Sequence, residues 1–406
     1  MNAHRQPGQG QSCQGQPCQG QRRQALRQAP RRAIAGFTLI ELLVAVTIGM
    51  GLTLAITLML VRYESGRRST TQLNDASIGG AFVSYALDRV VRSAGSGYAQ
   101  SWRNSFGCEL LVSRSGTTTL PRTTAFPAPF AGVPQAVRLA PVIVHAGAGT
   151  GGSDVLAVQT GASGLGESPL RVLPSSATTT GLRVPATVGL RGGDLVMVFQ
   201  GAGNCMLQQV AGGFAGGADQ QLNFGGTYAD SDINSVRLED MGTATTAWVT
   251  PLGNVSANRP MFQLIGVGAD ATLVAHDMLQ LDGTDTVVAM ADGVADLRAR
   301  YGVDTDGNGR IDSWVNPAIA PWDAASLLAG TPAAQANMAS ILALRVGVIM
   351  RTNTPERDPV APASLTLFSD LGSTLTATRT LSATEQQVRW RSLEFTVPLR
   401  NVLLKP

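Results

Sequence analysis

The fold is decided by the apolar stretch FTLIELLVAVTIGMGLTLAITLMLV, which occupies residues 37–61. It contains one charged side chain, Glu41, and Arg62 ends it. As an α-helix it would measure about 38 Å, more than the hydrocarbon core of a bilayer at about 30 Å. The sequence therefore predicts one transmembrane helix. Because Arg31 and Arg32 precede the stretch, we expect a cytoplasmic N-terminus and a head on the outer side of the membrane.

Glu41 is not explained by an ordinary signal anchor or by a secretory signal peptide. A carboxylate inside an apolar membrane helix costs about 2.5–3.5 kcal/mol on insertion scales, and such groups are usually functional. Cleavage after Gly36 would create a new α-amino group at Phe37, and Glu41 would then lie one helical turn further on. The sequence thus offers a cationic partner for the buried acid.

Residues 35–43, AGFTLIELL, resemble the class III signal of type IV prepilins and type II secretion pseudopilins. The resemblance implies that a prepilin peptidase removes residues 1–36, a long leader for this class, by cutting after Gly36 and then N-methylates Phe37. It also implies that Glu41 pairs with the N-terminal amine of a neighbouring subunit during assembly. In lipid this pair has few other ways to be satisfied.

The net charge of +3 does not indicate a nucleic-acid-binding protein. Residues 1–36 contain six arginines and no acid, which leaves 25 basic and 28 acidic residues in 37–406. The body holds two cysteines, too few for an all-cysteine zinc site. Its two histidines, His145 and His276, have no accompanying HExxH or nucleophile-elbow pattern, so we expect no enzyme.

The remainder predicts an α+β, pilin-like fold. Apolar residues spaced by three and four predict that residues 62–94 form the amphipathic half of the N-terminal helix. Residues 95–406 predict a β-rich head with large loop insertions at about 111–150, 161–193, 211–260 and 315–340. Strands are expected at 154–159, 195–200, 206–210, 261–267, 272–281, 286–290, 294–301, 342–350 and 393–399.

Cys108 and Cys205 lie in the exported part under this topology. An oxidising compartment favours a disulfide between them, and the alternative is two buried free thiols. The bridge would close a loop of nearly a hundred residues.

The segment DTDGNGRID at 304–312 resembles part of a calcium-binding loop. Oxygen side chains of Asp304, Asp306, Asn308 and Asp312 fall at loop positions 1, 3, 5 and 9, and Arg310 would offer its carbonyl at position 7. The twelfth position is a valine instead of the bidentate glutamate of an EF-hand. The sequence predicts a weak calcium site, completed by Asp296, Asp323 or water, and the alternative is a polar turn without metal.

Motifs further along the chain, in their order, resemble PilW-type minor pilins of the type IV pilus assembly system over most of residues 37–406. They lie at 87–89, 94–95, 107–108, 193–198, 294–304 and 394–401. The resemblance implies a minor pilin that primes pilus assembly, in the inner membrane and then in the filament near its tip. Its implied partners are the prepilin peptidase, other minor pilins, the major pilin, the inner-membrane assembly platform and the lipid bilayer. A J-type pseudopilin of type II secretion and a tip adhesin remain alternatives.

Overall fold

The computed structural model describes residues 36–163, 169–201, 203–217, 220–241 and 247–403. It divides into two compact units, residues 1–65 and 66–406. The leader expected over 1–36 lies outside the described residues, except for Gly36.

The long helix α1 runs from Leu39 to Arg92. Its part within the first unit is apolar, and Leu39–Glu64 is the one helix among the described residues that is long and apolar enough to cross a membrane. The side chains of this part are exposed throughout, as a lipid-facing surface requires. The prediction of a long apolar N-terminal helix is confirmed.

Within the second unit α1 packs on the head through one face. Val83, Leu87 and Val91 recur at intervals of four residues and are fully buried, the spacing that places side chains on one side of a helix. Gly80 lies against Leu393 so closely that a Cβ atom would collide with it. At Gly80 the helix therefore rests directly on the Leu393 side chain of the sheet.

The C-terminal end of α1 is tied to two distant segments of the head. The amide side chain of Asn401 donates to the carbonyl oxygens of Ser93 and Ala94 at 2.9 and 3.0 Å. Gly95 follows with φ +80° and donates its N–H to Gln159 O at 2.9 Å. The Asn401 bonds satisfy carbonyl groups just beyond the end of the helix, and the Gly95 bond attaches the following turn to Gln159. Helix α1 thus ends two residues before the predicted boundary at 94.

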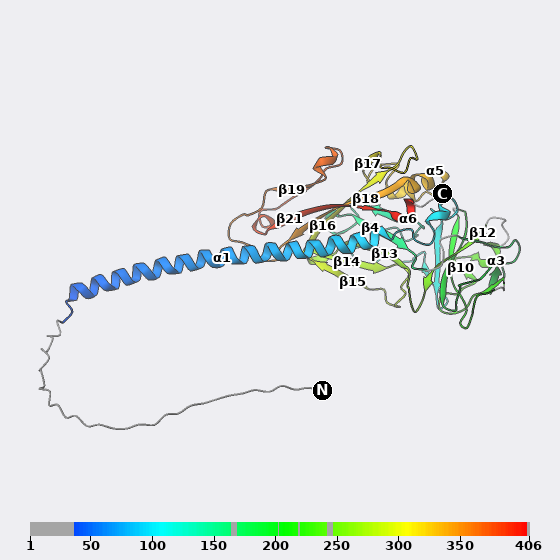
Figure 1. Cartoon of the computed structure of the whole chain (residues 1–406), viewed down its shortest axis with the longest axis horizontal. Helices are drawn as coiled ribbons and strands as arrows, with labels where there is room; N and C mark the ends of the chain where they lie inside the picture. The colour runs from blue at the N-terminus through cyan, green and yellow to red at the C-terminus, as the bar shows by residue number, and fades with distance from the viewer. Residues whose placement is uncertain (1–35, 164–168, 202, 218–219, 242–246, 404–406) are drawn as a thin grey trace, which may run out of the picture. The chain divides into compact units, whose positions relative to one another are not determined.

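Three larger sheets form the head (Figure 1). The first sheet has the strand order β2 (Thr117–Leu120), β1 (Glu109–Arg114), β8 (Asn204–Gln209), β7 (Asp194–Gln200), β12 (Ala247–Asn254) and β5 (Leu170–Arg171). The second has the order β15 (Val287–Asp292), β14 (Thr272–Asp277), β13 (Met261–Val267), β4 (Val155–Thr160) and β3 (Val142–His145). The third has the order β17 (Ser313–Val315), β16 (Val294–Val303), β18 (Ile341–Arg351) and β21 (Trp390–Pro398). Neighbours are antiparallel except for the parallel pair β1–β8.

Smaller elements complete the head. Three two-stranded ribbons are β6 (Gly181–Arg183) with β9 (Gln221–Asn223), β10 (Asp232–Ile233) with β11 (Val236–Arg237), and β19 (Ser364–Leu367) with β20 (Ala377–Thr380). The short α-helices are α2 (Trp102–Ser105), α3 (Leu238–Met241), α4 (Ala324–Leu327), α5 (Pro332–Ser340) and α6 (Arg400–Leu403).

Strand β7 separates two hydrophobic cores. Its residues Leu195, Met197 and Phe199 belong to the large core that also holds the buried face of α1. Val196 and Val198 belong to a second core on the other face of the same sheet. Successive side chains of a strand point to opposite faces, so one uninterrupted apolar run serves both cores.

Each of the nine predicted strands corresponds to a strand of the structure, and the α+β, pilin-like fold class is confirmed. The predicted loop insertions, however, are not free of regular structure. The segment 111–150 holds β2, β3 and most of β1, 211–260 holds β9 to β12, and 315–340 holds α4 and α5. Threonine, glycine or proline in β2 and β12 removes the alternating apolar pattern that marks a strand in sequence. The apolar runs of β1 and β3 are only three residues long, too short to identify a strand by themselves.

Candidate functional site

Gly36, Phe37 and Thr38 precede the first turn of α1. The Thr38 hydroxyl accepts a hydrogen bond from the backbone N–H of Glu41 at 3.3 Å, so Thr38 acts as the N-cap. The predicted cleavage point therefore lies in non-helical backbone, two residues before the helix begins. The spacing Thr38-x-x-Glu41 is a capping-box pattern that could have located this cap from the sequence.

Glu41 occupies the third position of α1, where the helix dipole favours a carboxylate. Its side chain is exposed and forms no ion pair with the part of the chain that the structure describes. Phe37 is 80% exposed. Both predicted assembly residues are thus available to another molecule.

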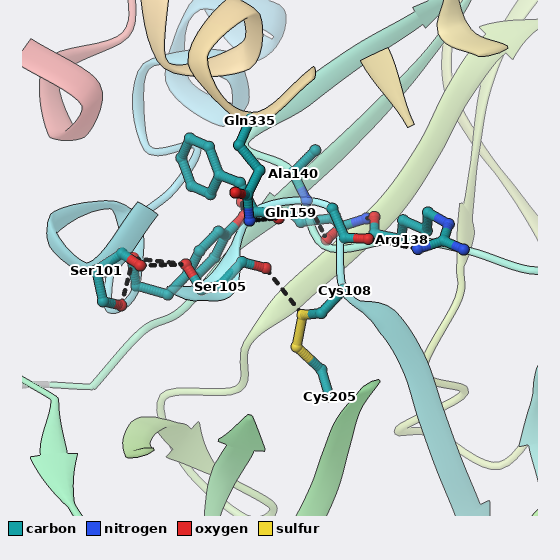
Figure 2. The surroundings of a disulfide bond; sticks show 11 residues. Ser101, Ser105, Cys108, Arg138, Ala140, Gln159, Cys205 and Gln335 are labelled. Carbon is teal, nitrogen blue, oxygen red and sulfur yellow. Dashed lines mark hydrogen bonds between the residues drawn. A yellow bond between two sulfur atoms is a disulfide. The ribbon is translucent and has the colours of Figure 1, made fainter. Parts of the chain in front are cut away.

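Cys108 and Cys205 are joined by a disulfide in the interior of the head (Figure 2). Their Cα atoms are 5.6 Å apart, within the usual range for a bridge. Cys108 directly precedes β1 and Cys205 lies in β8, where Leu110 is its partner in the parallel pair. Both sulfur atoms are inaccessible to solvent.

Hydrogen bonds fix the segment before Cys108. The Gln335 side chain on α5 donates to Phe106 O at 2.8 Å, and Ser105 donates to Ser101 O at 3.1 Å. Figure 2 shows these groups on one side of the bridge. The disulfide therefore joins this hydrogen-bonded segment to strand β8.

Asp304, Asp306 and Asp312 come together in the turn between β16 and β17, and oxygen atoms of the three lie within 4.8 Å of one another. Asn308 is part of the same turn, and its amide donates to Asp306 at 2.9 Å. The N–H of Arg310 donates to the Asn308 side-chain oxygen at 2.8 Å. We call these five residues the acidic turn. Their oxygen-rich donor set and spacing suit a hard cation such as calcium.

Backbone donors keep the acidic turn charged. Burial raises the pKa of the Asp304 carboxyl, but hydrogen bonds from the N–H groups of Gly309 and Gly307 outweigh this, and the net pKa is lowered. The Thr305 N–H and hydroxyl lower the pKa of the Asp312 carboxyl. Both carboxylates are therefore ionised at neutral pH and available to a cation.

The structure does not bring Asp296 or Asp323 into the acidic turn, so this part of the calcium prediction is wrong. Asp296 is paired with Arg298 at 3.1 Å on β16. Asp323 caps α4 by accepting from the Ser326 N–H at 3.2 Å. Both carboxylates have structural roles that sequence spacing cannot reveal.

A buried histidine lies at the end of β3, and the sequence pattern around it does not reveal its burial. Desolvation lowers the pKa of His145 to about 4. The unfolded chain has the ordinary value of about 6.5, so the unfolded state takes up a proton first on acidification. Stability is therefore lost as pH falls from about 6.5 to about 4, by up to about 3 kcal/mol.

A His145→Gln variant is expected to lose less stability between pH 7 and pH 4 than the unmodified protein. Urea unfolding of both proteins at each pH measures this difference, and the comparison cancels contributions from groups that the two share. If the unfolding free energies of the two proteins fell by the same amount between pH 7 and pH 4, the lowered pKa of His145 would be contradicted.

Two regions of the chain match known protein families. Residues 31–58 match the prokaryotic N-terminal methylation motif. Residues 264–401 match the family described as Type IV Pilus-assembly protein W. The second region contains the acidic turn, the strands β14 to β21 and the Asn401 cap. No curated protein and no solved structure matches the chain.

Proposed function

Because the chain carries a prepilin methylation motif and a W-type pilus-assembly region, we propose that it is a minor pilin that helps to initiate type IV pilus assembly. The observation that carries the proposal is the combination of Gly36-Phe37 in non-helical backbone, an apolar helix carrying Glu41, and a W-type head on the same chain. A structural rather than an enzymatic role is part of the proposal.

The proposed sequence of events begins in the inner membrane. Prepilin peptidase cuts after Gly36 and methylates the amine of Phe37, while the apolar part of α1 holds the chain in the bilayer and the head lies in the periplasm. The amine and Glu41 then pair between neighbouring subunits. This pairing neutralises two charges that would otherwise be unpaired in lipid, out of reach of water. The head contacts other minor pilins and places the subunit near the filament tip.

The intact mass and the N-terminal residue of the protein recovered from membranes and sheared filaments test this proposal. An N-methylated Phe37 at the N-terminus is the expected result. An uncut chain, or one cut elsewhere, would refute the prepilin assignment. Deleting the gene should abolish twitching and leave exoprotein secretion intact, whereas a J-type pseudopilin would give the reverse. Normal surface adhesion by piliated cells lacking the head loops would exclude the tip-adhesin alternative.

We also propose that the acidic turn binds calcium weakly. Three converging carboxylates support the proposal. The missing acid at position 12, Val315, places the expected dissociation constant in the range of about 0.1–1 mM that is typical of extracellular sites.

At 10 mM calcium this affinity is expected to raise the melting temperature by a few °C, since ligand binding stabilises the folded state by about 1–3 kcal/mol under these conditions. Asp306→Asn should remove most of the shift. Asp282→Asn is the matched control, because Asp282 is an exposed aspartate in a different turn. A melting temperature that does not respond to calcium or chelator would refute the site.

A further inference from the structure

Strand β15 is an exposed edge of the second sheet, and its one charged residue is Asp292 at its end. It pairs only with β14 among the strands that the structure describes. Its sequence is VVAMAD, and none of its residues is buried. Val288 is 59% exposed. One row of backbone N–H and C=O groups on this strand is therefore open to another chain.

The other long edge of the larger sheets is protected in a way that β15 is not. Strand β21 carries Arg391 and Glu394 and ends in Pro398, and charges and proline on an edge oppose pairing with another chain. The edge strands β2, β3, β5 and β17 have four residues or fewer. Among the edge strands of the described residues, only β15 is six residues long and has no charged residue among its first five.

A groove lies at the Asp292 end of β15 and has a volume of about 580 Å³. Its floor includes Ile78 and Phe82 of α1, which are 70% and 54% exposed. Two exposed carboxylates, Asp75 and Asp292, and one guanidinium, Arg351, lie on its lining. The charge balance of the groove favours an apolar segment that carries a basic residue.

We propose that β15 and the adjoining groove bind an extended segment of a partner protein, which adds a sixth strand to the sheet through uncharged residues and places a basic residue at its end beside Asp75 and Asp292. The chemistry of the edge identifies the occupant as a strand, because only extended backbone matches a continuous row of amide donors and acceptors. Strand β15 and the residues 350–354 that line the groove lie within the pilus-assembly W region, whereas the α1 side of the groove lies outside it. The inference therefore rests on the proposed function, and it identifies a surface through which the head could contact another pilin.

A peptide with the sequence KTVTVTVK is a suitable probe, because it is extended, uncharged between its ends and basic at both of them. The purified full-length chain in detergent is expected to bind it. Methylating alternate backbone nitrogens of the peptide should weaken binding at least about ten-fold, since each lost hydrogen bond weakens association several-fold. A peptide with glutamate at both ends should also bind less tightly. Equal binding of the methylated peptide would overturn strand addition, and equal binding of the glutamate peptide would overturn the charge preference.

Val288→Lys places a charge on the edge and should weaken peptide binding at least about ten-fold. Val188→Lys is the matched control, because Val188 is an exposed valine in a different part of the head, at 72%. Ala289→Lys, also at an exposed position of β15, provides a second variant if the first melts early. Equal binding by the edge variants and the control would refute the proposal.

The same variants separate this inference from the proposed function. Val288→Lys should still yield a protein that begins at Phe37, because the edge is remote in sequence from the processing site. Loss of peptide binding with normal processing supports both conclusions. Normal processing with unchanged peptide binding rejects the edge site alone, and failed processing of the unmodified chain rejects the pilin assignment.

Discussion

A Cys108→Ala, Cys205→Ala double variant is expected to lose about 4 kcal/mol of unfolding free energy. The disulfide joins residues 97 positions apart, and the chain-entropy model assigns about 4–5 kcal/mol to a closed loop of this length. This figure is an upper value, because residual structure in the unfolded chain reduces the benefit of the bridge. Alanine is preferred to serine because both positions are fully buried and a hydroxyl there would need a hydrogen-bond partner.

Urea unfolding of the full-length protein under oxidising conditions measures this loss. The single variant Cys108→Ala should lose nearly as much as the double variant, because either substitution abolishes the same bridge. Reduction of the unmodified protein should give a similar loss and should leave the double variant unchanged. A difference below about 1 kcal/mol would show that the bridge contributes little beyond the packing of β1 on β8.

The features that are predictable from the sequence depend on local spacing. The apolar stretch 37–61, the Gly36-Phe37 signal and the aspartates of 304–312 are each contained within a few turns of chain. Local order fixes which side chains share a helix or a turn, so spacing alone is enough to predict α1 and the acidic turn.

The features that are not predictable depend on contacts between distant segments. Strand β12 contains Pro251 and Gly253, which weaken a strand pattern in sequence, and it is held between β7 and β5. Asp323 looks like a metal ligand in sequence but serves as a helix cap. The open edge of β15 follows from the order of strands in the sheet, which no single segment encodes.

A Glu41→Ala variant is expected to reach the membrane and to be cut before Phe37, yet to be depleted from filaments by on the order of 100-fold. On the proposed pairing, loss of the carboxylate leaves the N-terminal amine of a neighbouring subunit unpaired in lipid. An unpaired charge there costs about 2.5–3.5 kcal/mol, and each 1.4 kcal/mol is a factor of ten in an equilibrium. Membrane insertion itself should not suffer, because the substitution removes a charge from the apolar helix.

Quantitative immunoblots of membranes and sheared filaments measure the depletion, and mass spectrometry verifies the processing. Glu64→Gln is the matched control, because Glu64 is the other carboxylate of the Leu39–Glu64 span and lies at its end. Glu41→Asp should recover part of the incorporation, because it keeps the charge on a shorter side chain. If Glu41→Ala entered filaments as well as the control, the amine would have another partner, and the register of assembly would have to come from contacts between heads.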